Sequence, residues 1–260
     1  MRRIKTTEYT VDNGVPESLK GKCIAFLSDY HEAAGGLFEK DILRILKEEK
    51  PECVLLGGDM LNSNEDPSDD LQCLKLINAM AKKHKVFYAY GNHEKKLSID
   101  YYDKGVDFER FLKRLDPRVT VLRNDNVRLF DDVYIYGLDI PIEFYGRIHF
   151  PDLNKSVMAG LLGKKPEDAY TILLAHTPDF IKGYSGWGAD LILAGHFHGG
   201  MVRLPLLGGV ISPRLRLFPK YDYGLYKEGN AVEIVTNGVG QHSVKIKINN
   251  CPEVVIVRFK

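Results

Sequence analysis

The organising pattern of this 260-residue chain is Cys53-Val-Leu-Leu-Gly-Gly-Asp-Met-Leu-Asn62, an apolar run that stops at two glycines and an aspartate. Short aliphatic and β-branched runs bounded in this way are typical of buried strands. Runs of the same kind recur along the chain at Cys23–Leu27, Val86–Tyr90, Thr120–Leu122, Val133–Tyr136, Ile172–Ala175 and Leu191–Ala194. Because segments of helical periodicity separate them, the sequence predicts an α/β fold in which strands and helices alternate.

The helical segments are recognisable by the spacing of their apolar residues. Leu37–Glu49 carries an apolar stripe on one side and is ended by Pro51, and Pro67–Lys83 has apolar residues about one turn apart. A short helix is expected at Asn154–Leu162. No internal repeat, low-complexity tract or linker interrupts the chain, so we expect a single domain over residues 1–260. The last part indicates a hairpin turn at Asp131-Asp132 and closing strands at Ala231–Thr236 and Val254–Phe259.

The composition argues against a general nucleic-acid-binding surface. The chain has 36 Lys+Arg against 35 Asp+Glu, a formal net charge of +1. Such a chain has no broad basic field for the phosphates of duplex nucleic acid, so no such partner is expected. Its four cysteines form no CxxC pair, which favours a reducing compartment, and no signal peptide or membrane-spanning stretch is evident. We therefore expect a cytoplasmic protein.

Polar residues follow five of the predicted strands, at the point where each strand ends. In a mostly parallel sheet the carboxyl ends of the strands share one edge, so these residues are expected to converge on one crevice. Five of the eight histidines lie in these segments. The segments are Ser28–His31, Gly57–Asn62, Gly91–Glu94, His176–Pro178 and Gly195–Gly200.

Aspartate, asparagine and histidine together suggest a metal site. Carboxylate oxygens with imidazole nitrogens suit Mn, Fe or Zn. Two carboxylates, one amide and four histidines exceed one tetrahedral shell, so two divalent ions are expected, with an aspartate able to bridge them. Each short motif alone is common in turns and caps. Their repeated occurrence just after strands favours the metal site.

These motifs resemble the signature of the calcineurin-like metallophosphoesterases, over about Lys22 to Gly200. Their sequences here are Asp29-x-His31, Gly58-Asp59-x-x-Asn62, Gly91-Asn92-His93-Glu94, His176 and Gly195-His196-x-His198. Three later stretches are similar to a bacterial subgroup of phosphodiesterases and lipid A precursor pyrophosphohydrolases: Gly199–Pro205, Phe218–Tyr226 and Thr236–Gly240. The resemblance implies a metallo-dependent phosphatase-like fold, a four-layer α/β/β/α sandwich.

The resemblance also implies seven metal ligands and one catalytic histidine. The ligands would be Asp29, His31 and His198 for one ion, Asn92, His176 and His196 for the other, and Asp59 as the bridge. His93 would assist the leaving group, while a hydroxide held by the two ions would attack phosphorus.

Two positions depart from the family pattern. Asn62 stands where the phosphoprotein phosphatases have an aspartate that orients the catalytic histidine, so the orienting hydrogen bond to His93 can survive but its charge cannot. Phe197 lies where a smaller polar residue is usual, and its side chain is expected to point away from the metals.

Two segments are candidates for substrate contacts. The stretch 201–220 is basic and apolar, which suits a lid over a lipid-linked substrate and a peripheral membrane contact, although a hairpin that packs its leucines on the sheet is the favoured interpretation. Between residues 142 and 165, surface positions are favoured for the polar residues. Asp139 belongs either to the surroundings of the site or to a turn. The residues concerned are Arg203, Arg214, Arg216 and Lys220 in the first segment and Tyr145, Arg147 and His149 in the second.

We therefore expect a metal-dependent hydrolase that cleaves a phosphodiester or pyrophosphate bond in a phosphorylated small-molecule, nucleotide or lipid-linked substrate. One alternative is a phosphomonoesterase or protein phosphatase, against which Asn62 argues mildly. A nuclease is disfavoured by the near-neutral charge. A non-catalytic metal-binding scaffold is the alternative of another class, and such proteins typically lack several ligands. The sequence indicates no oligomeric state.

Overall fold

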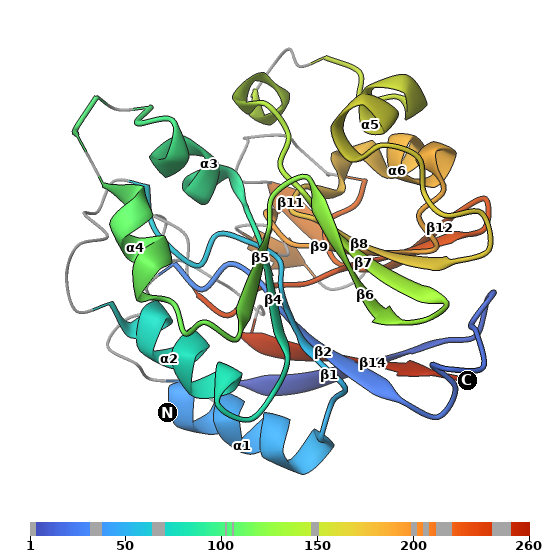
Figure 1. Ribbon diagram of the computed structural model, residues 1–260, viewed down its shortest axis with the longest axis horizontal. Helices are drawn as coiled ribbons and strands as arrows, with labels where there is room; N and C mark the ends of the chain where they lie inside the picture. The colour runs from blue at the N-terminus through green and yellow to red at the C-terminus, as the bar shows by residue number, and fades with distance from the viewer. Residues whose placement is uncertain are drawn as a thin grey trace.

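Two six-stranded sheets form the centre of the molecule, and helices lie outside both of them (Figure 1). The structure is a computed structural model. It describes residues 4–31, 38–63, 71–101, 103–105, 107–146, 151–198, 202–204, 208–211, 220–240 and 251–260. Within these residues, no helix has the length and apolar character that crossing a membrane requires.

The first sheet holds the strands from both ends of the described chain. All its neighbouring strands run parallel except the pair β14 and β2. The central strand β2 is buried along its whole length. The strand order is β1 (Lys5–Val11), β14 (Glu253–Phe259), β2 (Cys23–Leu27), β3 (Val54–Leu56), β4 (Val86–Ala89) and β5 (Val119–Leu122).

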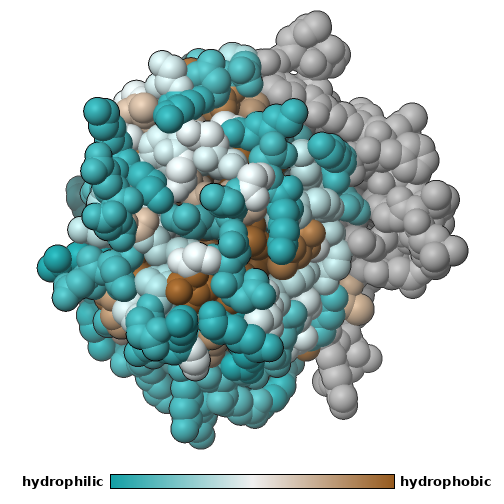
Figure 2. Space-filling model, turned by 90° about the vertical axis from the view of Figure 1, so that its right-hand side faces the viewer, coloured by the Kyte–Doolittle hydropathy of each residue, from teal (hydrophilic) through white to brown (hydrophobic). Residues whose placement is uncertain are grey.

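The second sheet has a parallel centre and an antiparallel strand at each edge. Its order is β12 (Gly224–Glu228), β13 (Ala231–Val235), β9 (Leu191–Ala194), β8 (Tyr170–Ala175), β7 (Val133–Leu138) and β6 (Asp125–Phe130). A separate antiparallel pair is formed by β10 (Val202–Leu204) and β11 (Gly208–Ile211). The side of the molecule that carries β12 is covered mainly by hydrophilic residues, with a limited apolar area near its middle (Figure 2).

Three apolar clusters hold these layers together. One lies between the sheets and joins Phe26 and Leu55 to Ile172 and Leu193. A second joins the outer face of the first sheet to its helices, and a third does the same for the second sheet. The helices on the first sheet are α1 (Glu39–Glu49), α2 (Gln72–Ala81), α3 (Asn92–Ser98) and α4 (Phe108–Arg114). Those on the second are η2 (Ile142–Tyr145), α5 (Lys155–Leu162), η3 (Pro178–Phe180) and α6 (Ile181–Trp187).

The expected four-layer α/β/β/α sandwich is confirmed. The runs Cys23–Leu27 and Leu191–Ala194 are strands with the predicted bounds. The helix expected at Pro67–Lys83 covers Gln72–Ala81, and residues 67–70 lie outside the described part of the chain. Strand β1 was not predicted, because its sequence KTTEYTV has a single fully buried residue, Val11.

Candidate metal centre

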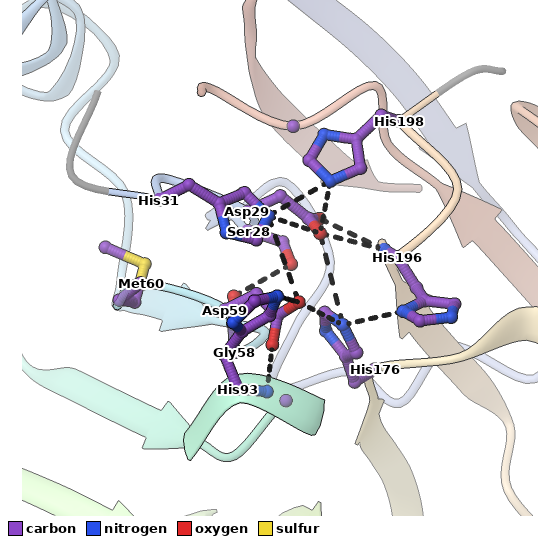
Figure 3. Close-up of polar contacts among 12 residues, drawn as sticks. Ser28, Asp29, His31, Gly58, Asp59, Met60, His93, His176, His196 and His198 are labelled. Carbon is purple, nitrogen blue, oxygen red and sulfur yellow. Dashed lines mark hydrogen bonds and ion pairs between the residues drawn. The ribbon is translucent and has the colours of Figure 1, made fainter. Parts of the chain in front are cut away.

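The polar residues that follow five strands do converge, at the edge where the carboxyl ends of both sheets meet. The first sheet supplies Asp29 and His31 after β2, Asp59 after β3, and Asn92 and His93 after β4. The second supplies His176 after β8 and His196 and His198 after β9. Figure 3 shows the imidazole rings turned toward the two aspartates. Neither sheet alone carries the whole set, so the site depends on their packing.

One group of possible ligands consists of Asp29, His31 and His198. Asp29 Oδ1 lies 3.2 Å from His198 Nε2 and 3.8 Å from His31 Nε2. The two imidazole Nε2 atoms are 3.1 Å apart. These three atoms therefore face one small space in which they could hold a metal ion.

A second group consists of Asp59, His176 and His196. Asp59 Oδ2 lies 3.1 Å from His176 Nε2, which is 3.2 Å from His196 Nδ1. The same Asp59 oxygen is 3.9 Å from His31 Nε2 in the first group. Asp59 thus stands between the two groups, where a bridging carboxylate would be needed.

The imidazole nitrogens and carboxylate oxygens of these two groups suit divalent ions such as Mn, Fe or Zn. Asn92 supports this fit, because its Oδ1 atom is buried and has no hydrogen-bond partner among the described residues. Buried amide oxygens are normally paired, so an oxygen of this kind at a cluster of imidazoles and carboxylates suits a ligand role. His176 has its remaining nitrogen, Nδ1, 2.8 Å from the carbonyl oxygen of Gly57, which leaves Nε2 facing the site.

The aspartates and the histidines of the site each stabilise the charged form of the other. Burial acts to lower the pKa of His176, but the carboxylates of Asp59 and Asp29 outweigh it and raise the pKa to about 9. Burial would raise the pKa of Asp59 and of Asp29, yet the surrounding imidazoles hold both well below the usual range. Both carboxyl groups are therefore ionised at neutral pH, as metal ligands must be.

The backbone is strained at five of the proposed ligands. Left-handed φ values are uncommon outside glycine and mark positions that the surrounding structure enforces. The glycines nearby leave room for the carboxylates: a Cβ atom at Gly195 would lie 2.1 Å from Asp29 Oδ2, and one at Gly91 would lie 2.3 Å from Asp59 Oδ1. The φ angles are 55° at Asp29, 47° at His31, 51° at Asp59, 67° at His196 and 49° at His198.

Among the described residues the Asn62 side chain contacts His31, whereas the orienting hydrogen bond to His93 that the sequence allowed is not formed between them. Its Oδ1 atom lies 3.1 Å from His31 Nδ1, and its Nδ2 atom donates to the backbone oxygen of His31 at 3.1 Å. His93 Nδ1 instead accepts a hydrogen bond from the backbone N–H of Ser63 at 2.7 Å. Asn62 therefore holds the ring of a proposed ligand.

The neutral His93 ring therefore carries its proton on Nε2, since Nδ1 is an acceptor. Burial lowers the pKa of His93 to about 4, although Asp59 acts to raise it. At neutral pH the side chain is uncharged, and Nε2 lies 3.9 Å from Asp59 Oδ2. His93 is thus placed as a hydrogen-bond donor beside the possible ligands.

The other candidate residues have different outcomes. Tyr145 lies at the site, with its ring centroid 5.7 Å from that of His196. Asp139 is buried and accepts hydrogen bonds from Lys95 Nζ at 3.0 Å and Arg123 Nε at 2.8 Å, so it ties α3 to the end of β7. Phe197 is buried beside His196. Outside the described residues or side chains lie Arg147, His149, Arg203, Arg214 and Arg216. Of the stretch 201–220, the structure describes the backbone of the antiparallel pair β10 and β11 and the exposed Lys220.

Sequence reasoning gave no role to Glu94, although it quoted the residue within a motif. Glu94 is completely buried and occupies the third position of α3, where a glutamate reaches back to the start of a helix. That capping position was the available signal. It predicts the hydrogen bond to Gly91 but not the contacts of Glu94 with a loop some 35 residues earlier.

Comparison with known proteins agrees with this geometry. The sequence pattern of the calcineurin-like phosphoesterases matches residues 24–200. An uncharacterized metallophosphoesterase of Aquifex aeolicus is 30% identical over 266 residues, covering 99% of this chain and 92% of the relative. The phosphodiesterase YaeI of Escherichia coli is 26% identical, covering 91% of this chain and 81% of the relative.

Another relative is the uncharacterized metallophosphoesterase YkuE of Bacillus subtilis, which is 25% identical and covers 99% of this chain and 86% of its own length. The crystal structure of TT1561 of Thermus thermophilus is similar in fold, with a TM-score of 0.51 at 13% identity, covering 85% of this chain and 90% of that one. The match of the family pattern to most of the chain shows that this protein belongs to the calcineurin-like phosphoesterases, a family of metal-dependent hydrolases that act on phosphorylated substrates.

Proposed function

We propose that the protein hydrolyses a phosphodiester or pyrophosphate bond with two divalent ions. The observation that carries this proposal is the position of Asp59, whose Oδ2 atom lies 3.1 Å from His176 Nε2 and 3.9 Å from His31 Nε2. One carboxylate within reach of both groups suits a pair of ions. In this assignment Asp29, His31 and His198 hold one ion, Asn92, His176 and His196 hold the other, and Asp59 bridges them.

When bound, the ions supply an activated water and neutralise charge on the phosphoryl oxygens. The residues of the chain do the rest. The two buried aspartates bring negative charge to the site. The ring of His31 is held by its Nδ1 contact with Asn62 Oδ1, and the ring of His176 by the hydrogen bond that the Gly57 carbonyl accepts from Nδ1. We assign His93 the role of donating a hydrogen bond from its Nε2–H to a substrate oxygen, since its Nδ1 accepts from the backbone N–H of Ser63.

The bond class rests on two considerations. The relative YaeI, 26% identical over most of this chain, is named a phosphodiesterase. In addition, the amide of Asn62 is turned to His31, so His93 receives no help from a carboxylate at position 62 of the kind found in phosphoprotein phosphatases. We extend the proposal to Mn, Fe or Zn as the ions, and to nucleotide or lipid-linked substrates.

The test compares hydrolysis of bis-p-nitrophenyl phosphate and p-nitrophenyl phosphate by the protein reconstituted with Mn²⁺, before and after chelation. A chelator-sensitive rate that is higher on the diester supports the proposal. A higher rate on the monoester would favour a phosphomonoesterase. Absence of turnover on both, with two Mn²⁺ bound per chain, would favour a metal-binding scaffold.

His93→Ala is the variant that tests the assigned role. It is expected to keep its Mn²⁺ and to lose turnover by about 10²–10³-fold, the usual cost of removing one hydrogen-bond donor that faces developing negative charge. His84→Ala is the matched control and should retain the wild-type rate, because His84 is partly buried in the turn between α2 and β4, at the opposite end of β4 from the site. A fully active His93→Ala protein would refute the assignment.

A further inference from the structure

Glu94 accepts five hydrogen bonds in a site to which no solvent has access. Its Oε2 atom accepts from the backbone N–H groups of Asp59 at 2.7 Å and Gly91 at 2.9 Å. Its Oε1 atom accepts from the N–H groups of Met60 at 2.8 Å and Leu61 at 3.2 Å, and from the Tyr88 hydroxyl at 2.8 Å. One carboxylate thus joins two loops that are far apart in the sequence.

Three backbone N–H groups of the loop after β3 depend on this carboxylate for their hydrogen bonds. Asp59, Met60 and Leu61 lie outside any strand or helix and are at most 2% exposed. Their three consecutive N–H groups would be buried donors without Glu94, and unpaired buried donors are costly. The side chain of Asp59 returns the contact, because its Oδ1 atom accepts from the backbone N–H of His93 at 2.8 Å.

The two loops also touch through their backbones. A Cβ atom at Gly58 would lie 2.1 Å from the backbone nitrogen of Gly91, a distance that no side chain tolerates. Glycine at both positions lets the loop that carries Asp59 lie directly against the loop that carries Asn92 and His93. Glu94 holds this contact together, because it accepts hydrogen bonds from the backbone of both loops.

We propose that Glu94 is a positioning residue for the reaction, which fixes Asp59 relative to Asn92 and His93. This inference rests on the proposed function, because it concerns the bridging carboxylate and the histidine assigned there. Hydrogen bonds from three N–H groups of the Asp59 loop to Glu94 hold that loop in its strained turn. A fourth, from the N–H group of Gly91, fixes the start of α3. Without the carboxylate, Asp59 and Asn92 lose their fixed relation while every proposed ligand is still present.

The test uses Glu94→Gln, since Glu94→Ala removes all five acceptor contacts and endangers folding. Glutamine keeps the size of the side chain, but its amide group turns one acceptor into a donor that faces N–H groups. We expect Mn²⁺ affinity, measured by calorimetric titration, to fall by about 10–100-fold, as for other residues that orient ligands. At saturating Mn²⁺, kcat should fall by at least about ten-fold while KM changes little.

Ile45→Ala is the control for lost stability alone. Ile45 is a buried residue of α1 in the apolar cluster that joins the helices to the first sheet, and it is none of the proposed ligands. It should lower the melting temperature and leave Mn²⁺ affinity and kcat unchanged below the unfolding range. A folded Glu94→Gln protein with wild-type Mn²⁺ affinity and kcat would overturn the inference, and so would an activity loss that merely follows its unfolded fraction. Failure of the wild type to bind Mn²⁺ or to turn over would instead overturn the proposed function.

Discussion

Replacing Gly58 by alanine is expected to damage both stability and activity, because two physical effects add at this position. Gly58 has a φ angle of +88°, which L-residues other than glycine rarely adopt. Left-handed backbone costs such a residue about 1–2 kcal/mol. The new methyl carbon would also lie 2.1 Å from Gly91 N and 2.5 Å from Gly91 Cα, and both neighbours are backbone atoms that cannot rotate away.

The size of the effect follows from these two terms. Overpacking against atoms that cannot yield typically costs about 1–3 kcal/mol, so Gly58→Ala should lower the free energy of unfolding by about 2–5 kcal/mol in all. Relief of the clash requires the Asp59 loop to move away from Asn92 and His93. We therefore expect turnover to fall by at least about ten-fold, the usual result of misplacing a positioned group by a fraction of an ångström to one ångström.

Urea denaturation of the metal-free protein measures the first effect, and diester hydrolysis at saturating Mn²⁺ measures the second. Gly14→Ala is the matched control, because Gly14 has a φ angle of +63° and no heavy atom within 4 Å of its Cβ position. It should cost only about 1 kcal/mol and leave turnover unchanged. The reasoning is refuted if Gly58→Ala loses no more stability than Gly14→Ala, or if its turnover equals that of the wild type.

Three further predictions concern the ions and the buried charges. Asn62→Ala removes both hydrogen bonds to His31 and should weaken Mn²⁺ binding by about ten-fold or more. Calorimetric titration of wild type and variant measures this, and equal affinities would contradict it. Mn²⁺ at about a hundred times its dissociation constant should raise the free energy of unfolding by about 2.7 kcal/mol per ion, and the gain should shrink in Asp29→Asn; denaturation with and without chelator decides this. Burial raises the pKa of Glu233 well above its usual value of 4.5, so the folded state binds a proton that the unfolded state has released above that pH. Between the unfolded-state and the folded-state pKa of this group, the wild type should therefore lose about 1.4 kcal/mol of stability per pH unit as pH rises. Glu233→Gln should lack this loss, and parallel stability curves for the two proteins would count against the prediction.

The strands at the centre of the fold were predictable because burial on both faces leaves an unbroken apolar run. Cys23–Leu27 shows this pattern, and each of its residues is buried. The edge strand β1 gives no such signal, since most of its side chains reach solvent and its partner β14 comes from the other end of the described chain. Sequence periodicity reports burial, so it detects the strands of the core and overlooks those at the rim.

At the site, residue types and their order after strands were enough to predict which side chains meet. They were not enough to predict which atoms face each other. Asn62 contacts His31 from a loop in which Asp59 adopts a φ angle of 51°, and spacing along the sequence contains no information on such a backbone conformation. The contacts of Glu94 were not predicted for a related reason, since three of its five hydrogen-bond partners lie more than 30 residues away in the sequence.

The pairing of β1 with β14 also has a consequence for synthesis of the chain. Because β14 lies between β1 and β2, the first strand has no place in the sheet until Glu253–Phe259 has left the ribosome. Until β14 has been synthesised, β1 therefore lacks its partner in the sheet, and an apolar strand in that state would promote aggregation. The seven residues of β1 include a lysine, a glutamate and three threonines, so the unpaired strand is well solvated until its partner is available.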